Sequence, residues 1–73
     1  MGKLRLLKAG HGDLVLAEWK DTETIEYARI AFDRERLLGR MAFRLDGPGL
    51  TTPIVDFEEA ADEILLVPAV VGG

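Results

Sequence analysis

The chain has 73 residues, 48% of them hydrophobic and 30% charged, with no cysteine and a formal net charge of −4. Short chains bury only about 60% of their unfolded surface, so this length accommodates a single small domain with a thin core. The lack of cysteine excludes disulfides, thiolate metal ligands and a cysteine nucleophile. The negative charge disfavours nucleic acid and anionic membranes as partners, and no apolar run approaches the ~20 residues of a membrane span. We therefore expect a cytoplasmic protein that binds neither nucleic acid nor membranes.

The first part of the chain predicts a β-hairpin. Residues 3–6 alternate polar and apolar side chains, as a half-buried strand does. A glycine-containing turn follows at residues 9–13, and residues 14–19 form a second apolar run. In one phase of this second strand Val15, Ala17 and Trp19 face the core. In the other phase Leu14 and Leu16 do, and periodicity alone leaves both phases open.

A helix is predicted to begin after residue 20. Asp21, Thr22 or Thr24 can cap its first free N–H groups, and acidic residues follow that suit the positive end of a helix. Gly39 is the expected C-cap. The apolar residues at helical spacing, expected to face the core, are Ile25, Ala28, Phe32 and Leu37.

The rest of the chain predicts strands and turns. Residues 41–45 alternate as a third strand, residues 46–49 carry strong turn signals, and a brief strand follows at residues 50–52. Residues 53–61 are too polar and too few for a core element, although residues 55–59 could form one helical turn. The last strand spans residues 63–67.

This order of elements predicts an α+β fold, in which one main helix packs on one face of a mixed four- to five-stranded sheet. The first and last strands can pair in parallel at its centre, where both faces of a strand are covered, and the last strand is nearly all apolar. The domain is expected to span residues 1–67, with a flexible tail at residues 68–73.

These elements and the final Gly-Gly resemble ubiquitin and its β-grasp relatives over the whole chain. Thr24-Ile25-Glu26 is similar to the start of the ubiquitin helix, and residues 43–47 to its third strand and turn. Asp56-Phe57 resembles the Asp-Tyr of its short late helix, and residues 64–73 its last strand and tail. The resemblance implies the β-grasp fold and a modifier of the prokaryotic ubiquitin-like kind.

The resemblance also implies a partner-binding surface on the sheet face away from the helix. We expect an apolar patch there from Leu14, Leu16, Leu65 and Val67. Arg44 matches the exposed isoleucine that ubiquitin presents to its readers, so ordinary ubiquitin readers are not expected to bind this protein.

The tail carries the predicted chemistry. Pro68 cannot donate to a sheet ladder and marks the exit from the sheet, and six residues can span roughly 20 Å. The ubiquitin tail carries two arginines, and this chain has Ala69 and Val71 at the matching positions. The segment Pro68-Ala69-Val70-Val71 is therefore expected to bind an apolar groove of a partner enzyme. Glycine passes through narrow channels, so Gly72 and Gly73 are the expected activation and conjugation site.

By resemblance, an activating enzyme consumes ATP to adenylate Gly73, and a conjugating enzyme passes it through a thioester to lysines of target proteins. A deconjugating protease reverses the attachment. The protein itself is expected to be no enzyme and to hold no catalytic residue, bound cofactor or metal.

Two alternatives stay open. The tail from Asp62 is also similar to sulfur carriers such as the small subunit of molybdopterin synthase and the thiamine-pathway carrier, which end in a thiocarboxylate. Ala61-Asp62 replaces their Gly-Asp turn, and Pro68-Ala69 replaces their frequent Pro-Pro. The second alternative is a β-grasp interaction module that is not conjugated.

The remaining polar residues are expected to be solvated. His11 lies between two glycines without partner ligands. The lysines, Lys3, Lys8 and Lys20, are possible self-attachment points, with solubility as their default role. The acidic residues near the end of the chain are Asp56, Glu58, Glu59, Asp62 and Glu63.

Overall fold

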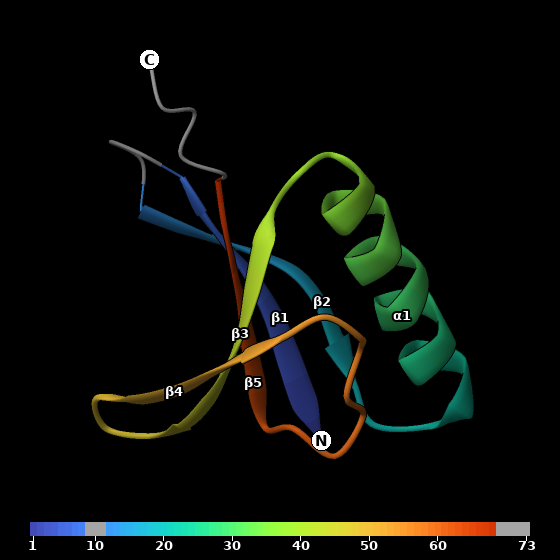
Figure 1. Cartoon of the computed structure of the whole chain (residues 1–73). Helices are drawn as coiled ribbons and strands as arrows, with labels where there is room; N and C mark the ends of the chain where they lie inside the picture. The colour runs from blue at the N-terminus through green and yellow to red at the C-terminus, as the bar shows by residue number, and fades with distance from the viewer. Residues whose placement is uncertain (9–11, 69–73) are drawn as a thin grey trace.

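The computed structural model describes residues 1–8 and 12–68 of the chain. Its elements are β1 (Gly2–Lys8), β2 (Gly12–Trp19), α1 (Thr22–Leu37), β3 (Met41–Gly47), β4 (Leu50–Ile54) and β5 (Glu63–Val67). They form two layers, with α1 on one face of the sheet (Figure 1).

The strands form a five-stranded mixed sheet in the order β2-β1-β5-β3-β4. β1 and β5 are parallel at its centre, as the sequence predicts, and the other neighbouring pairs are antiparallel. Ile64 and Leu66 of β5 are fully buried beneath the helix. The fold is an α+β, ubiquitin-like β-grasp, so the predicted fold class is confirmed.

A β-bulge in the first hairpin explains why neither phase of β2 holds throughout. The pairing of β1 with β2 skips Leu16, which is the extra residue. On one side of the bulge Ala17 and Trp19 face the core. On the other side Leu14, rather than Val15, lies opposite a buried residue of β1. One extra residue shifts the alternation of side chains by one, so each phase holds over part of the strand.

The helix begins where the sequence predicts it. Asp21 is the N-cap: its Oδ1 accepts a hydrogen bond from the Thr24 N–H at 2.9 Å, and the Asp21 N–H donates to the Thr24 hydroxyl at 3.0 Å. Phe32 is fully buried, as predicted, but Leu37 is 88% exposed and its predicted inward position is wrong. Five residues turn a helix by about 140° beyond a full turn, so Leu37 points away from the face of Phe32.

The end of α1 lies one residue from the prediction. Leu38 is the C-cap and keeps a right-handed helical backbone. Gly39 follows with a φ of 94°, the left-handed region that glycine occupies without a steric penalty. Its N–H donates to the Arg36 carbonyl at 3.0 Å, which satisfies one of the free carbonyls at the helix end.

The connection between β4 and β5 contributes to the core, contrary to the prediction for residues 53–61. Phe57 is 9% exposed, and its ring packs edge-on against Trp19 and Phe32, with ring centroids 5.0 and 5.8 Å away. Residues 55–59 form no helical turn. Burying one phenylalanine stabilises a fold by about 1.5–3 kcal/mol, which outweighs the polarity of the neighbouring residues.

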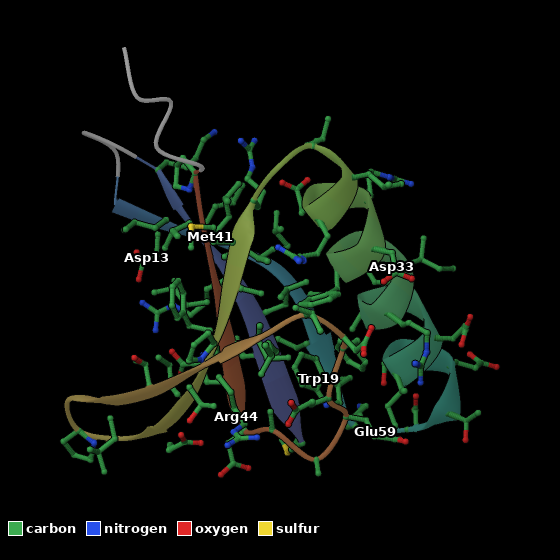
Figure 2. The ribbon with its side chains drawn as sticks, in the orientation of Figure 1. Asp13, Trp19, Asp33, Met41, Arg44 and Glu59 are labelled. Carbon is green, nitrogen blue, oxygen red and sulfur yellow. The ribbon has the colours of Figure 1, made fainter. Side chains whose placement is uncertain are left out.

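Trp19 joins this connection to the start of β1. Its indole Nε1 donates to the main-chain carbonyl of Glu59 at 2.9 Å (Figure 2). The indole also covers Gly2, where an added Cβ would lie 2.1 Å from Trp19 Cε2. Only glycine therefore fits at this position unless the indole moves.

Candidate functional site

The candidate site is the sheet face that points away from α1, together with the point where the chain leaves β5. Ile64 and Leu66 are buried on the helix side of β5. Side chains alternate along a strand, so Glu63, Leu65 and Val67 lie on the opposite face, here called the outer face.

Strand pairing places further apolar side chains beside Leu65 and Val67. Phe43 lies opposite Leu65, and Met41 lies opposite Val67. Met41 and Leu7 are 47% and 40% exposed. The six residues that form this outer patch are Leu7, Met41, Phe43, Pro53, Leu65 and Val67. They gather at the end of the sheet where β5 finishes, near the labelled Met41 (Figure 2).

Sequence reasoning missed the members of the outer patch that β1, β3 and β4 provide. The available signal was the alternation of β3, in which small Ala42 is buried and Phe43 therefore lies on the outer face. That signal becomes usable only when the pairing of β3 with β5 is known, because the phase of β3 is ambiguous from its sequence.

Charged side chains border the outer patch toward the beginning of β5. Arg5 forms ion pairs with Asp13 and Glu63. Lys3 lies opposite Glu63 on one side and Glu18 on the other. The outer face is therefore apolar toward the end of β5 and charged toward its beginning.

Leu14 and Leu16 do not lie on the outer face with Leu65 and Val67. Leu16 packs against the core from its position in the bulge. Leu14 is 45% exposed, but it lies opposite the buried Leu6 and so belongs to the helix side. The bulge is the physical reason for this correction, because it reverses the phase of β2.

Arg44 also lies on the helix side, contrary to its predicted match with the exposed isoleucine of ubiquitin. It pairs with the buried Ile64 of β5 and with Thr52 of β4. The residue of β3 on the outer face beside Leu65 is Phe43. A partner bound to the outer face therefore meets an aromatic ring at this place and not a guanidinium group.

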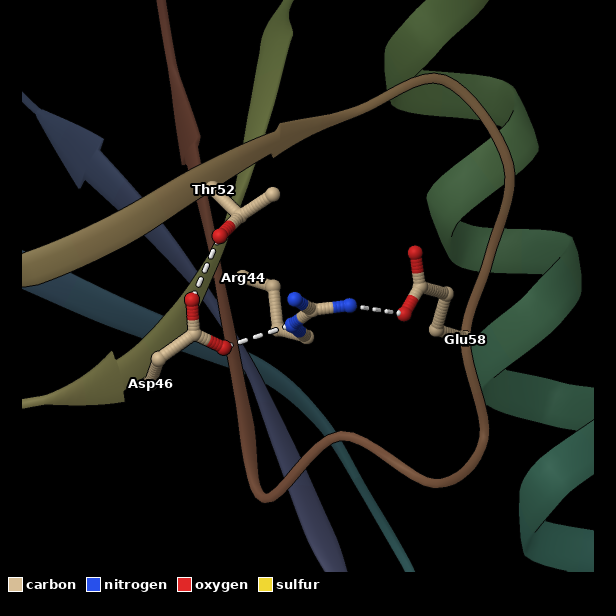
Figure 3. Close-up of polar contacts among 4 residues, drawn as sticks. All are labelled: Arg44, Asp46, Thr52 and Glu58. Carbon is tan, nitrogen blue, oxygen red and sulfur yellow. Dashed lines mark hydrogen bonds and ion pairs between the residues drawn. The ribbon is translucent and has the colours of Figure 1, made fainter.

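Arg44 organises a polar network beneath the connection between β4 and β5 (Figure 3). Its Nε donates to Asp46 at 2.6 Å, and its Nη1 donates to Glu58 at 2.7 Å. The Thr52 hydroxyl also donates to Asp46. The hydrogen bond from Arg44, aided by that from Thr52, lowers the pKa of Asp46 below its ordinary value of 3.8, and Arg44 in turn has a raised pKa.

The acidic residues near the end of the chain do not form one cluster but contact different partners. Glu58 bonds Arg44, Glu63 pairs with Arg5, and the backbone of Glu59 binds Trp19. Among residues 1–8 and 12–68, no three side chains of metal-ligand type lie close enough together to hold a metal ion. Over the same residues, no helix has the length and apolarity to cross a membrane.

The exit of the chain follows the last residue of the outer patch. Pro68 is exposed directly after β5. Five predicted site residues, Ala69, Val70, Val71, Gly72 and Gly73, lie outside the described residues, as does His11. Lys8 and Lys20 are exposed and Lys3 is half-buried.

Comparisons with protein-family models, curated proteins and solved structures found no match to this chain. The features of the molecule that bear on function are the β-grasp fold and the outer patch beside the chain exit. An apolar surface next to an exit point suits the binding of a partner that also receives the following segment.

Proposed function

We propose that this protein is a ubiquitin-like modifier that is attached to lysines of target proteins through Gly73. The observation that carries the proposal is the position of the outer patch. Val67 ends both β5 and the patch, and Pro68 is the first of the six residues that lead to Gly72-Gly73. An enzyme bound to the patch is thus close to the start of the segment it must accept.

The proposed chemistry needs no catalytic group from this chain. A Gly73 carboxylate oxygen attacks the α-phosphate of ATP in the activating enzyme, forming an acyl-adenylate and releasing pyrophosphate. A cysteine thiolate of that enzyme displaces AMP to give a thioester, which passes to a cysteine of the conjugating enzyme. A lysine amine then displaces the thiolate, loses a proton and forms the isopeptide bond.

The outer patch is the proposed docking surface for the partner enzymes. Phe43, Leu65 and Val67 offer a continuous apolar surface, while the paired Arg5 and Glu63 border it. Aromatic residues and methionine, here Phe43 and Met41, are enriched at protein interfaces. The tail residues Ala69 and Val71 are uncharged, so the activating enzyme is proposed to receive them in an apolar groove.

The test is expression of the N-terminally tagged chain in its native host, followed by intact-mass measurement and detection of tagged adducts. A ladder of heavier species that yields peptides in which a target lysine carries the C-terminal segment of this chain through Gly73 supports conjugation; trypsin leaves residues 45–73 on that lysine, because the last basic residue is Arg44. Deletion of Gly73 is expected to abolish the ladder. Intact mass also establishes whether the mature polypeptide finishes at Gly73, which the chemistry requires.

Other results would contradict the proposal. A mass increase equal to sulfur replacing one oxygen, with no adducts, identifies the sulfur-carrier alternative. An unchanged mass with neither adducts nor sulfur identifies an interaction module. Adducts that persist after deletion of Gly73 show that attachment uses a different group.

A further inference from the structure

The last residues of β1 and β5 lie at the same end of the sheet. The two strands are parallel neighbours, with Leu6 opposite Leu66. Two residues further along each strand, β1 ends at Lys8 and the chain leaves β5 at Pro68. Figure 1 shows both strands finishing on this side of the molecule. Lys8 is exposed, so its amine lies near the start of the segment that carries Gly73.

The other two lysines of the chain lie toward the opposite end of the sheet. Lys3 is half-buried, and five steps along β1 separate it from Lys8, which corresponds to about 17 Å. Lys20 directly follows β2, whose last residue pairs with Gly2 at the beginning of β1. Lys20 is therefore even further than Lys3 from the point where the chain leaves the sheet.

Chain length favours Lys8 as the amine that Gly73 can reach. Five residues, 69–73, follow Pro68 and span at most about 17–18 Å when fully extended. Contact with Lys3 needs almost all of this length, directed back along the sheet, whereas contact with Lys8 needs only a short loop. Closing a short loop costs less conformational entropy than closing a long one, and a short flexible tether gives an effective concentration on the order of millimolar.

We infer that Lys8 is an internal acceptor for Gly73, so that an activated copy can close on itself instead of modifying a target. The inference rests on the proposed function, because only an activated carboxyl group reacts in this way. The unprotonated Nζ of Lys8 attacks the carbonyl carbon of the Gly73 thioester, and the C–S bond breaks as the thiolate leaves. The nitrogen then loses a proton to water, and the resulting lactam is lighter than the free acid by one water.

This reaction gives the tail groove of the partner enzyme a second task. Side chains alternate along β1, so Lys8 lies on the other side of the strand from Leu7 of the outer patch. An enzyme bound to the outer patch therefore leaves Lys8 uncovered. A groove that holds residues 69–73 extended keeps Gly73 away from Lys8 until a target lysine arrives.

The test uses the full chain prepared with a C-terminal thioester at Gly73, which needs no activating enzyme. Its conversion is followed by intact mass at mildly alkaline pH, where more of the lysine amine is unprotonated. The parent protein is expected to form the lactam at a rate that does not depend on protein concentration. After trypsin digestion, residues 6–20 are expected to be joined through Lys8 to residues 45–73.

Lys8→Arg keeps the positive charge but removes the nucleophile, so the yield of lactam is expected to fall by about tenfold or more in favour of the hydrolysed acid. The matched control is Lys20→Arg, which makes the same change at the other end of the sheet and is expected to close as the parent does. Thermal melts establish that each variant is folded.

The inference is overturned by a parent thioester that only hydrolyses, by closure that survives Lys8→Arg, or by a linkage that maps to another amine. A product of twice the mass, formed faster at higher concentration, shows reaction between copies and also overturns it. Adduct detection in the native host tests the proposed function separately. Closure through Lys8 without any adducts there contradicts conjugation and supports the assignment of Lys8.

Discussion

The indole nitrogen of Trp19 donates a hydrogen bond to the main-chain carbonyl of Glu59, 2.9 Å away. This bond joins the end of β2 to the connection between β4 and β5. Trp19 and Glu59 are 40 residues apart in the sequence. Beside it, Phe57 packs edge-on against the same indole. The connection is therefore held by one polar and one aromatic contact to a single side chain.

We predict that Phe57→Ala lowers the free energy of unfolding by about 3–5 kcal/mol, as expected for emptying a buried aromatic site. Urea unfolding measures the change. Val55→Ala is the control in the same connection, because Val55 is 71% exposed, and its effect is expected within about 0.5 kcal/mol. Equal effects of the two variants would mean that Phe57 is not part of the core.

Gly2→Ala is predicted to destabilise the fold by about 1–3 kcal/mol, because the new methyl group would overlap the Trp19 indole. Thermal unfolding of the two proteins is the measurement. Gly47→Ala is the control, since a Cβ there would have its nearest neighbour 3.8 Å away. A neutral Gly2→Ala, with Gly47→Ala also neutral, would argue against the close approach of the indole.

The lowered pKa of Asp46 predicts a pH dependence of stability. A carboxyl that is more acidic in the folded protein stabilises the fold above its ordinary pKa, and this contribution disappears as the pH falls through the folded pKa. The stability difference between the parent protein and Asp46→Asn is therefore expected to be constant from about pH 7 to 5 and to shrink below about pH 4.

Urea unfolding at each pH provides this difference. The titration of Asp21, whose pKa is also lowered through the backbone N–H of Thr24, is common to both proteins and cancels. High salt is expected to reduce the difference at neutral pH, because Arg44 and Asp46 lie near solvent. A difference that stays constant down to about pH 2.5 would contradict the assigned pairing.

The outer patch is predicted to bind the activating or conjugating enzyme. Met41→Asp places a charge beside Val67 at the patch edge, where Met41 is already 47% exposed, so the fold is expected to persist. Adduct formation in the native host should fall by about tenfold or more. Val55→Asp, exposed outside the patch, should leave adduct levels unchanged; a similar loss in both variants would remove the assigned role of the patch.

Local signals predicted most of the fold. The Asp21 and Thr24 caps are short-range contacts, and the apolar run of β5 indicated the central position that this strand has between β1 and β3. The Leu16 bulge is different: it arises from how β2 matches β1, and the run of apolar residues 14–17 has no residue that marks it. The phase of the hairpin was therefore undetermined.

The candidate site was harder to predict than the fold, because it depends on register. A shift of one residue along β3 exchanges Phe43 and Arg44 between the two faces of the sheet, and the resemblance placed Arg44 on the wrong one. Phe57 was missed for a related reason: one large ring among polar neighbours gives no periodicity, and its burial depends on Trp19 and Phe32 being present.

The parallel pairing of β1 with β5 affects how the chain acquires its structure. The central ladder joins Lys3 to Glu63 and Leu6 to Leu66, so it closes only after residues 63–66 have been synthesised. Contacts between residues so distant in sequence slow folding compared with a helical bundle of the same size. A nascent chain that lacks residues 63–67 lacks the strand that joins β1 to β3, so the two hairpins of the sheet are connected only once β5 has been added.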